Sequence, residues 1–355
     1  MTINQDSTSW EVILRAMRLT TEEREALAAY ARRLTAADLP VIFGFEHLAH
    51  LLGVEPLSLA KISSAPKHFY REFEIPKRSG GSRRISAPYP ALLEIQRWIA
   101  QSTLCKLECH DSAFGFVKGR SIVDNARQHL NTRSILRVDI TDFFPSINLR
   151  RVIAVFRELG YLPSVSYWLA SLCVLNGTLP QGVPSSPALS NIIARRLDRR
   201  LTALAEIAQL RYSRYADDLV FSGEIVLLST LSLICEIVES EGFRVNEKKT
   251  ILATGRKKKI VTGISVSGEE PKLPRATRRK LRQELHYVQS LGVASHMTTT
   301  NQQDPLFVER LLGKFSFWQQ VEPNNAYVLA AVSSLRNLQA NLDERYFDNA
   351  TTGSG

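Results

Sequence analysis

The chain has 355 residues, of which 44% are hydrophobic and 23% charged, a composition typical of folded rather than disordered proteins. No apolar stretch reaches the roughly 20 residues needed to span a bilayer, residues 1–10 lack the apolar core of a secretory signal, and four cysteines are too few for a disulfide framework. We therefore expect a cytoplasmic protein with two or three core-bearing parts. The formal net charge of +10 indicates a polyanionic partner, either nucleic acid or an anionic membrane surface.

The elements predicted in chain order mix helices with short, separate strands. Helical spacing and capping residues predict helices within 9–60, and at 92–107, 152–159, 184–204, 227–240, 275–291 and 306–320. Strands are expected at 135–140, 243–246 and 260–266, with hairpins over 69–87 and 212–222. The first hairpin has a basic tip, and an Asp-Asp turn connects the strands of the second. This mixture indicates an α+β fold.

The excess positive charge is concentrated in one part of the chain. Segment 244–282 contains 13 Lys and Arg against three acidic residues, so it accounts for the whole net charge. A smaller cluster at 71–84 has five basic and two acidic residues. Basic patches on either side of a neutral, apolar middle favour a groove for a charged polymer. For 257–259 alone, solvated loop charge is an equally good interpretation.

Carboxylates lie at the ends of two predicted strands. Asp139 ends the strand near 135–140, and Asp217 and Asp218 form the turn of the second hairpin. Adjacent aspartates in an apolar stretch repel each other, so they need a compensating cation. Mg²⁺ binds a few carboxylates together with phosphate oxygens, and two such ions can hold both oxygens of a nucleotidyl transfer. Taken alone, the Asp217-Asp218 pair could also be an ordinary turn with no metal. The presence of Asp139 upstream favours the interpretation as a metal site.

Several segments in a fixed order resemble the motifs of reverse transcriptases. Tyr215-Ala-Asp-Asp218 resembles the catalytic box of these enzymes, and 139–147 their first palm motif. The other similar segments are the LPQG-type stretch 179–187, the motif 242–250 and the primer-grip region 261–263. The resemblance covers about 69–266, over half of the chain. It implies a right-hand polymerase with an RRM-like palm, fingers built from a hairpin and helices, and a helical thumb.

The same resemblance implies a division of the chain into parts. We expect an N-terminal helical extension at 1–62, fingers at 63–136, a palm at 137–270 with fingers-type helices at about 150–178, a helical thumb at 271–346, and a flexible tail at 347–355.

Two boxes narrow the resemblance to retron reverse transcriptases. Asn125-Ala-Arg-Gln-His129 matches the NAxxH box of that group, and Val261-Thr262-Gly263 matches its VTG box. Each box also has a structural interpretation: Asn125 as a helix cap, His129 as a core histidine, and the Thr-Gly pair as a bulge. The alternatives to a retron enzyme are another bacterial reverse transcriptase (diversity-generating, abortive-infection or group II intron-like) and a scaffold that binds RNA or an effector without polymerising.

The resemblance to retron enzymes implies an activity and partners. Such enzymes bind a structured noncoding RNA of the msr-msd type and begin DNA synthesis at the 2′-hydroxyl of a guanosine. They use dNTPs and two Mg²⁺ ions, with Mn²⁺ as a substitute, and their product is a branched msDNA. An effector or toxin protein encoded nearby commonly completes an anti-phage defence system. A membrane surface is then no longer expected as the partner.

The motif positions also imply residue roles. Asp139, Asp217, Asp218 and the backbone carbonyl of Ile140 are expected to bind the metal ions, and Lys249, with Lys248 as the alternative, is expected to protonate or hold the pyrophosphate. The residues expected to bind the incoming dNTP are Lys77, Arg83, Arg84, Asp142, Phe143, Phe144, Gln181 and Gly182. In this set the ring of Phe144 is expected to exclude a ribose 2′-hydroxyl. Either Arg83 or Arg84 would neutralise the triphosphate.

A basic helix is expected to contact the nucleic acid. Four arginines recur at helical spacing within 275–291 and form a stripe, for which a solvated helix face is the alternative. We expect the stripe to grip an RNA stem or its hybrid through phosphate contacts. The full set expected to contact RNA or DNA is Asn125, His129, Val261, Thr262, Gly263, Lys272, Arg275, Arg278, Arg279 and Arg282.

Overall fold

The computed structural model describes residues 10–76, 80–293, 295, 297 and 304–352, and side chains as far as 340. The chain divides into two compact units. The first comprises Met1–Arg120, Arg137–Leu219 and Leu227–Thr250, and the second Ser121–Leu136, Val220–Val226 and Ile251–Gly355. Within the described residues, none of the helices combines the length and apolar character that crossing a bilayer requires.

The N-terminal helices of the first unit were predicted and are present. They are α1 (Trp10–Ala16), α2 (Thr21–Ala36), α3 (Phe45–Leu51) and α4 (Pro56–Ser64), followed by the short helix η1 (Pro66–Phe69). Thr20 and Glu23 form a reciprocal capping box that begins α2. Helix α3 contacts α8 (Pro163–Ser171), with the rings of Phe45 and Trp168 5.3 Å apart. The hydroxyl of Tyr161, which lies between α7 (Leu149–Glu158) and α8, donates to the Pro40 carbonyl.

The basic hairpin of the first unit is confirmed. Strands β1 (Tyr70–Pro76) and β2 (Ser82–Pro88) pair antiparallel, with Tyr70 opposite Pro88 and Pro76 opposite Ser82. Helix α5 (Pro90–Ser102) follows and buries Leu92, Ile95 and Ile99 on one face, as their helical spacing predicts. The short helix η2 (Leu104–Lys106) ends this segment.

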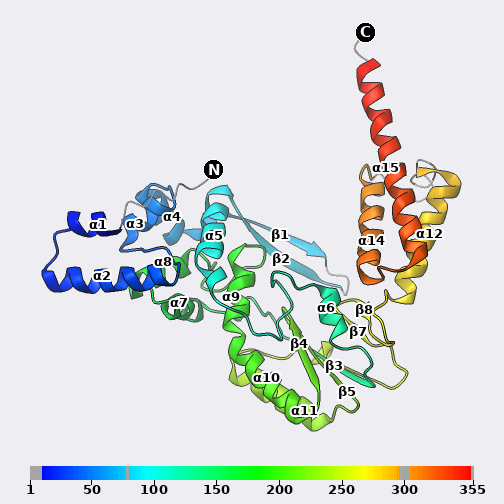
Figure 1. The fold of residues 1–355 in the computed structure, drawn as a ribbon, viewed down its shortest axis with the longest axis horizontal. Helices are drawn as coiled ribbons and strands as arrows, with labels where there is room; N and C mark the ends of the chain where they lie inside the picture. Colours follow the sequence, from blue (N-terminus) through cyan, green and yellow to red (C-terminus); the bar gives the residue numbers. More distant parts are fainter. Residues whose placement is uncertain (1–9, 77–79, 294, 296, 298–303, 353–355) are drawn as a thin grey trace. The chain divides into compact units, whose positions relative to one another are not determined.

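A four-stranded sheet carries the predicted carboxylates. Its order is β4 (Arg211–Tyr215), β5 (Asp218–Gly223), β3 (Ser134–Asp139) and β6 (Ile251–Thr254). Helix α10 (Arg195–Ile207) packs on β4 and beside α11 (Leu228–Ser240), and α9 (Ser185–Ile193) precedes α10 (Figure 1). The predicted helix 184–204 is thus two helices that meet at Ala194. Strand β6 was not predicted, whereas helix α8 lies within 150–178, where the resemblance implied fingers-type helices.

Two strand predictions were wrong. Residues 243–246 form no strand, because only Val245 bridges to Ile140 before the short helix η3 (Glu247–Lys249). Residues 260–266 form a small hairpin, β7 (Ile260–Val261) and β8 (Ile264–Ser265), instead of one strand. The φ angles of Thr262 and Gly263 are 46° and 84°, and two residues in the left-handed region reverse the chain.

The second unit has its own helical core. It contains α6 (Ile122–Arg127), the β7–β8 hairpin, α12 (Arg275–Leu291), α14 (Phe307–Val321) and α15 (Ala326–Thr352). Buried residues from these helices, such as Leu281, Leu285, Phe315 and Trp318, form one apolar cluster. Helix α15 extends to Thr352, so its backbone is helical through most of the stretch expected to be a flexible tail. The proposed division into fingers, palm and thumb stays a prediction.

Candidate active site

The end of β3 is fixed against the turn that connects β4 to β5. The backbone N–H of Ile140 donates to the Asp217 carbonyl at 2.9 Å. On the other side, the N–H of Asn246 donates to the Asp139 carbonyl at 2.7 Å, and its side-chain Nδ2 donates to Asp139 Oδ1 at 3.1 Å. These contacts bring Asp139 and Asp217 together, as their motif positions predict. Asn246 was not predicted, although it lies in the motif 242–250 that the sequence singles out.

Burial makes the charged forms of the turn carboxylates unfavourable. It raises the pKa of Asp217, and the negative charge of Asp139 raises it further. Burial likewise raises the pKa of Asp218 to about 6, against the opposing charge of Arg137. Buried carboxylates that repel one another are stabilised by a cation, and their hard oxygen donors suit Mg²⁺.

The cation that contacts Asp139 in the structure is an ammonium. Lys249 Nζ donates to Asp139 Oδ1 at 3.0 Å and to Oδ2 at 2.9 Å, and this contact raises the pKa of Lys249. Lys248 is exposed and forms no ion pair with the described side chains. Among the described residues, no three His, Cys, Asp or Glu are grouped closely enough to hold a metal ion. The carboxylates are nevertheless hard oxygen donors of the kind that Mg²⁺ prefers, and a metal ion at Asp139 would have to displace the ammonium of Lys249.

A cavity of about 900 Å³ in the first unit opens beside these carboxylates. Its lining includes most of the residues predicted to bind metal or dNTP, namely Arg83, Arg84, Asp139, Ile140, Asp142, Phe143, Gln181, Asp217 and Lys249. Asp218, Phe144 and Gly182 are not among the lining residues. Lys77 lies outside the described residues.

The two candidate arginines on β2 differ in their partners. Arg84 Nη2 lies 2.6 Å from Glu72 Oε2 on the facing strand. Arg83 forms no ion pair with the described side chains, and its positive charge lowers the pKa of Asp217. Arg83 is therefore the arginine whose charge reaches the carboxylates.

The paired phenylalanines after Asp142 have different environments. Phe143 is 2% exposed, and its ring lies 5.5 Å from the ring of Phe243, so its side chain belongs to the core. Phe144 is half-buried, and its ring lies 6.1 Å from that of Phe116. The backbone N–H groups of Asp142 and Phe143 donate no hydrogen bond within the described part of the chain. Both N–H groups are therefore available to an anionic ligand.

The Gln181-Gly182 pair is attached to the hairpin strand β2. The N–H of Ser86 donates to the Gln181 carbonyl at 2.8 Å. Gly182 has a φ of 105°, and a Cβ at this position would lie 2.7 Å from Ile85 Cγ2. Only glycine fits both the conformation and the space. The close approach keeps Gln181 on the cavity lining.

Comparison with known proteins identifies the family of this chain. The family model described as reverse transcriptase (RNA-dependent DNA polymerase) matches residues 75–293. A retron Ec86 reverse transcriptase from Escherichia coli is 32% identical over 72% of this chain and 81% of its own length. The chain belongs to the retron reverse transcriptases. Its α+β fold is accordingly that of a right-hand polymerase.

Other relatives of this retron reverse transcriptase extend the similarity. Retron Mx162 and Mx65 reverse transcriptases from Myxococcus xanthus are 35% and 37% identical over 72% of this chain, and the matches cover 60% and 65% of their lengths. A solved structure of a foamy viral protease-reverse transcriptase in complex with double-stranded DNA is more distant. It has 14% identity and a TM-score of 0.40, over 92% of this chain and 59% of that one.

The two retron boxes pack together in the second unit. Thr262 Oγ1, in the turn of the β7–β8 hairpin, donates to the carbonyl of Ile122 in α6 at 3.1 Å. Asn125, His129 and Val261 are all 0% exposed. Direct contact of these three side chains with nucleic acid therefore does not agree with this structure. The interpretation of His129 as a core histidine does agree, since its Nδ1 lies 2.7 Å from Ser222 Oγ.

The basic stripe of α12 is not uniform. Arg275 and Arg279 are exposed, whereas Arg278 is half-buried. The guanidinium of Arg282 lies 4.7 Å from the ring centroid of Tyr327 and 5.7 Å from that of Trp318, so it packs on α14 and α15. Lys272 keeps an exposed side chain while its backbone pairs with Ser265. Arg282 is exposed like Lys272, Arg275 and Arg279, and it differs from them in its contacts with the two aromatic rings.

Proposed function

We propose that this RNA-directed DNA polymerase copies part of a bound, structured noncoding RNA of the msr-msd type into DNA. Synthesis would begin at a guanosine 2′-hydroxyl and yield branched msDNA. One observation is the main support for the polymerase chemistry. At the junction of β3 with the β4–β5 turn, the Ile140–Asp217 hydrogen bond brings two carboxylates to one cavity. The names of the relatives, which are retron reverse transcriptases, support an RNA template, and the branched product rests on the family resemblance alone.

Residues that line the cavity, together with Asp218 next to Asp217, would share the steps of nucleotidyl transfer. Asp139, Asp217, Asp218 and the Ile140 carbonyl would hold two Mg²⁺ ions, or Mn²⁺ in their place, which would activate the attacking hydroxyl and neutralise phosphate charge. Arg83 and the free N–H groups of Asp142 and Phe143 would bind the triphosphate. Lys249, once released from Asp139, would donate a proton to the leaving pyrophosphate or hold it.

Nucleotide selection would depend on Gln181, which lines the cavity, and on Phe144, which does not line it but lies between the lining residues Phe143 and Pro145 in the sequence. Gln181 would contact the incoming nucleotide, with Gly182 keeping it in place against β2. The ring of Phe144, backed by Phe116, would meet the sugar and exclude a ribose 2′-hydroxyl by its bulk.

The nucleic acid would be bound by the basic segment 244–282, which contains the exposed Lys272, Arg275 and Arg279. A nearby-encoded effector protein and a role in anti-phage defence belong to the proposal through the family resemblance alone. A cytoplasmic location is supported by the four free cysteines.

The nucleic acid that co-purifies with the protein tests this proposal. RNase treatment of the purified complex is expected to leave a discrete small DNA, which still carries a branched RNA residue at its 5′ end. The Asp217→Asn protein should co-purify with the RNA and no such DNA. DNA synthesis without a discrete branched product would instead indicate another kind of bacterial reverse transcriptase, and absence of any synthesis would indicate a scaffold.

A further inference from the structure

Arg214, three residues before Asp217, is a buried charge with a complete set of partners. Its side chain is 0% exposed, and its Nε and Nη2 donate to Oδ1 and Oδ2 of Asp198 at 2.7 and 2.6 Å. Asp198 lies on α10 and is equally buried, and the Tyr212 hydroxyl also donates to it. This two-point contact fixes the plane of the guanidinium.

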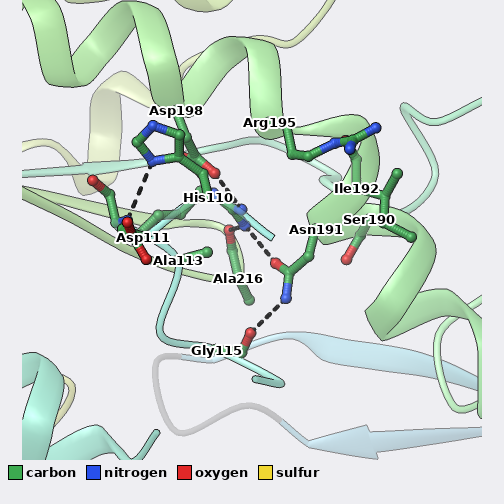
Figure 2. Close-up of polar contacts among 12 residues, drawn as sticks. His110, Asp111, Ala113, Gly115, Ser190, Asn191, Ile192, Arg195, Asp198 and Ala216 are labelled. Carbon is green, nitrogen blue, oxygen red and sulfur yellow. Dashed lines mark hydrogen bonds and ion pairs between the residues drawn. The ribbon is translucent and has the colours of Figure 1, made fainter. Parts of the chain in front are cut away.

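The remaining nitrogen of the guanidinium, Nη1, contacts the turn between β4 and β5 that contains Asp217. Arg214 Nη1 donates to Asn191 Oδ1 at 3.0 Å and to the backbone carbonyl of Ala216 at 3.3 Å. Asn191 in turn donates from Nδ2 to the carbonyl of Gly115 at 2.7 Å. Figure 2 shows Asn191 between Gly115 and the dashed contacts that lead to Asp198 and Ala216. One side-chain network therefore joins two helices, a loop and the turn.

The loop that contains Gly115 is attached to the same strand. Arg214 N–H donates to the Ser112 carbonyl at 2.7 Å, and Phe114 N–H donates to the Arg214 carbonyl at 2.8 Å. A Cβ at Gly115 would lie 2.7 Å from the backbone nitrogen of Ala216. The loop and the turn are thus in contact through backbone atoms, with no room for a side chain between them.

Ala216 needs this support because of its backbone conformation. Its φ of 56° lies in the left-handed region, which alanine rarely adopts. Such conformations persist where the surrounding structure over-determines them, and they gather at functional sites. Here the carbonyl of Ala216 is held by Arg214, and its nitrogen is covered by Gly115. The next residue is Asp217.

We propose that Arg214, oriented by Asp198 and Asn191, is a positioning residue that holds Ala216 in its left-handed conformation and thereby places Asp217 beside Asp139. The inference rests on the proposed function in that Asp217 is taken as a metal ligand. The competing explanation is that the buried ion pair stabilises the fold and leaves the turn unaffected.

Two substitutions separate these explanations. Arg214→Lys keeps the charge and loses the planar fork, so kcat for dNTP incorporation per folded molecule should fall about 10- to 100-fold, with little change in KM for dNTP. Ala216→Gly adopts a positive φ without help. The double variant Arg214→Lys/Ala216→Gly should therefore recover part of the kcat that Arg214→Lys loses, and none of the lost thermal stability. Unchanged kcat per folded molecule in Arg214→Lys would overturn the inference.

A second variant covers the case in which Arg214→Lys does not fold. Gly115→Ala leaves the ion pair intact but forces the turn to move, so it too should lower kcat about tenfold or more. Gly44→Ala is the matched control, since a Cβ at Gly44 meets nothing within 4 Å and no positive φ is involved. Equal kcat in Gly115→Ala and Gly44→Ala would overturn the inference.

Mn²⁺ binding in the absence of nucleotide distinguishes this inference from the proposed function. Titration followed by electron paramagnetic resonance should show weaker Mn²⁺ binding in Gly115→Ala and Arg214→Lys than in the wild type and Gly44→Ala. That result supports the positioning role even if the wild type copies no RNA. Unchanged Mn²⁺ affinity together with unchanged kcat contradicts it.

Discussion

The ammonium of Lys249 contacts both carboxylate oxygens of Asp139, at 2.9 and 3.0 Å. A metal ion held by Asp139 would need the same oxygens. Lys249 and a metal ion would therefore compete for one carboxylate, and a lysine released from Asp139 would be free to bind the triphosphate. This relationship assigns Lys249 rather than Lys248 to the site.

Lys249→Gln should have two opposite effects. Loss of the proton donor should reduce kcat about 100-fold, while loss of the competing cation should lower the Mg²⁺ concentration that gives half-maximal incorporation. Single-nucleotide incorporation over a Mg²⁺ titration measures both quantities. Lys248→Gln is the matched control and should resemble the wild type. Equal effects of the two substitutions would contradict the assignment.

Asp218→Asn should stabilise the metal-free protein near neutral pH. Burial raises the pKa of the Asp218 carboxyl from its ordinary value of 3.8 to about 6. Within this window the folded protein retains a proton that the unfolded chain releases, so the free energy of unfolding falls as the pH rises. The neutral amide of the Asp218→Asn variant has no such proton to lose, so the variant does not suffer this fall in stability. At about pH 7 its free energy of unfolding is expected to exceed that of the wild type by about 1–3 kcal/mol.

Urea unfolding in EDTA measures this effect. The gain should disappear at about pH 3, where the carboxyl is protonated in the folded state and largely so in the unfolded chain. Added Mg²⁺ should stabilise the wild type more than the variant. A variant that is less stable than the wild type at neutral pH would contradict the buried, repelled state of Asp218.

Arg83→Gln and Arg84→Gln should differ in their effect on nucleotide binding. Arg83 has no acidic partner among the described residues, and its charge reaches Asp217, whereas Arg84 is paired with Glu72. We expect Arg83→Gln to raise KM for dNTP about tenfold, the loss of a charge-assisted contact, and Arg84→Gln to change it little. Steady-state kinetics on one primer-template measures KM for dNTP in both variants. A larger effect from Arg84→Gln than from Arg83→Gln would reverse the assignment.

The double substitution Arg275→Glu/Arg279→Glu should weaken RNA binding through charge. Both side chains are exposed on α12, so the affinity for a labelled RNA hairpin should fall and its salt dependence should become shallower. Arg282→Gln should instead lower thermal stability, since the guanidinium of Arg282 packs on the rings of Tyr327 and Trp318. Full RNA affinity of the double variant at moderate salt would show that the stripe is only a solvated face.

The carboxylate site could be predicted because its residues lie in short local patterns. Asp139 follows a β-branched run, and Asp217 lies in a tight turn between two strands. The contact of Lys249 with Asp139 could not be predicted in the same way. It depends on residues 243–246 remaining irregular, so that the Asn246 N–H reaches the Asp139 carbonyl where a regular strand was expected.

Burial of the retron boxes depends on contacts between distant segments. The hydroxyl of Thr262 bonds to the carbonyl of Ile122, 140 residues away, and this contact joins the hairpin turn to α6. Local sequence does not show whether Asn125 faces the core or the surface. Similarly, helical spacing predicted the stripe on α12, but only the fold of α14 and α15 shows that aromatic rings engage Arg282.

The most direct measurement is Mg²⁺-dependent dNTP incorporation on an RNA template, comparing the wild type with Asp217→Asn at equal concentrations of folded protein. The wild type should extend the primer, and the variant should lose at least about 100-fold in rate, because one of the carboxylates that binds the cations is gone. Equal incorporation by the two proteins would contradict the placement of the metal site at Asp139 and Asp217.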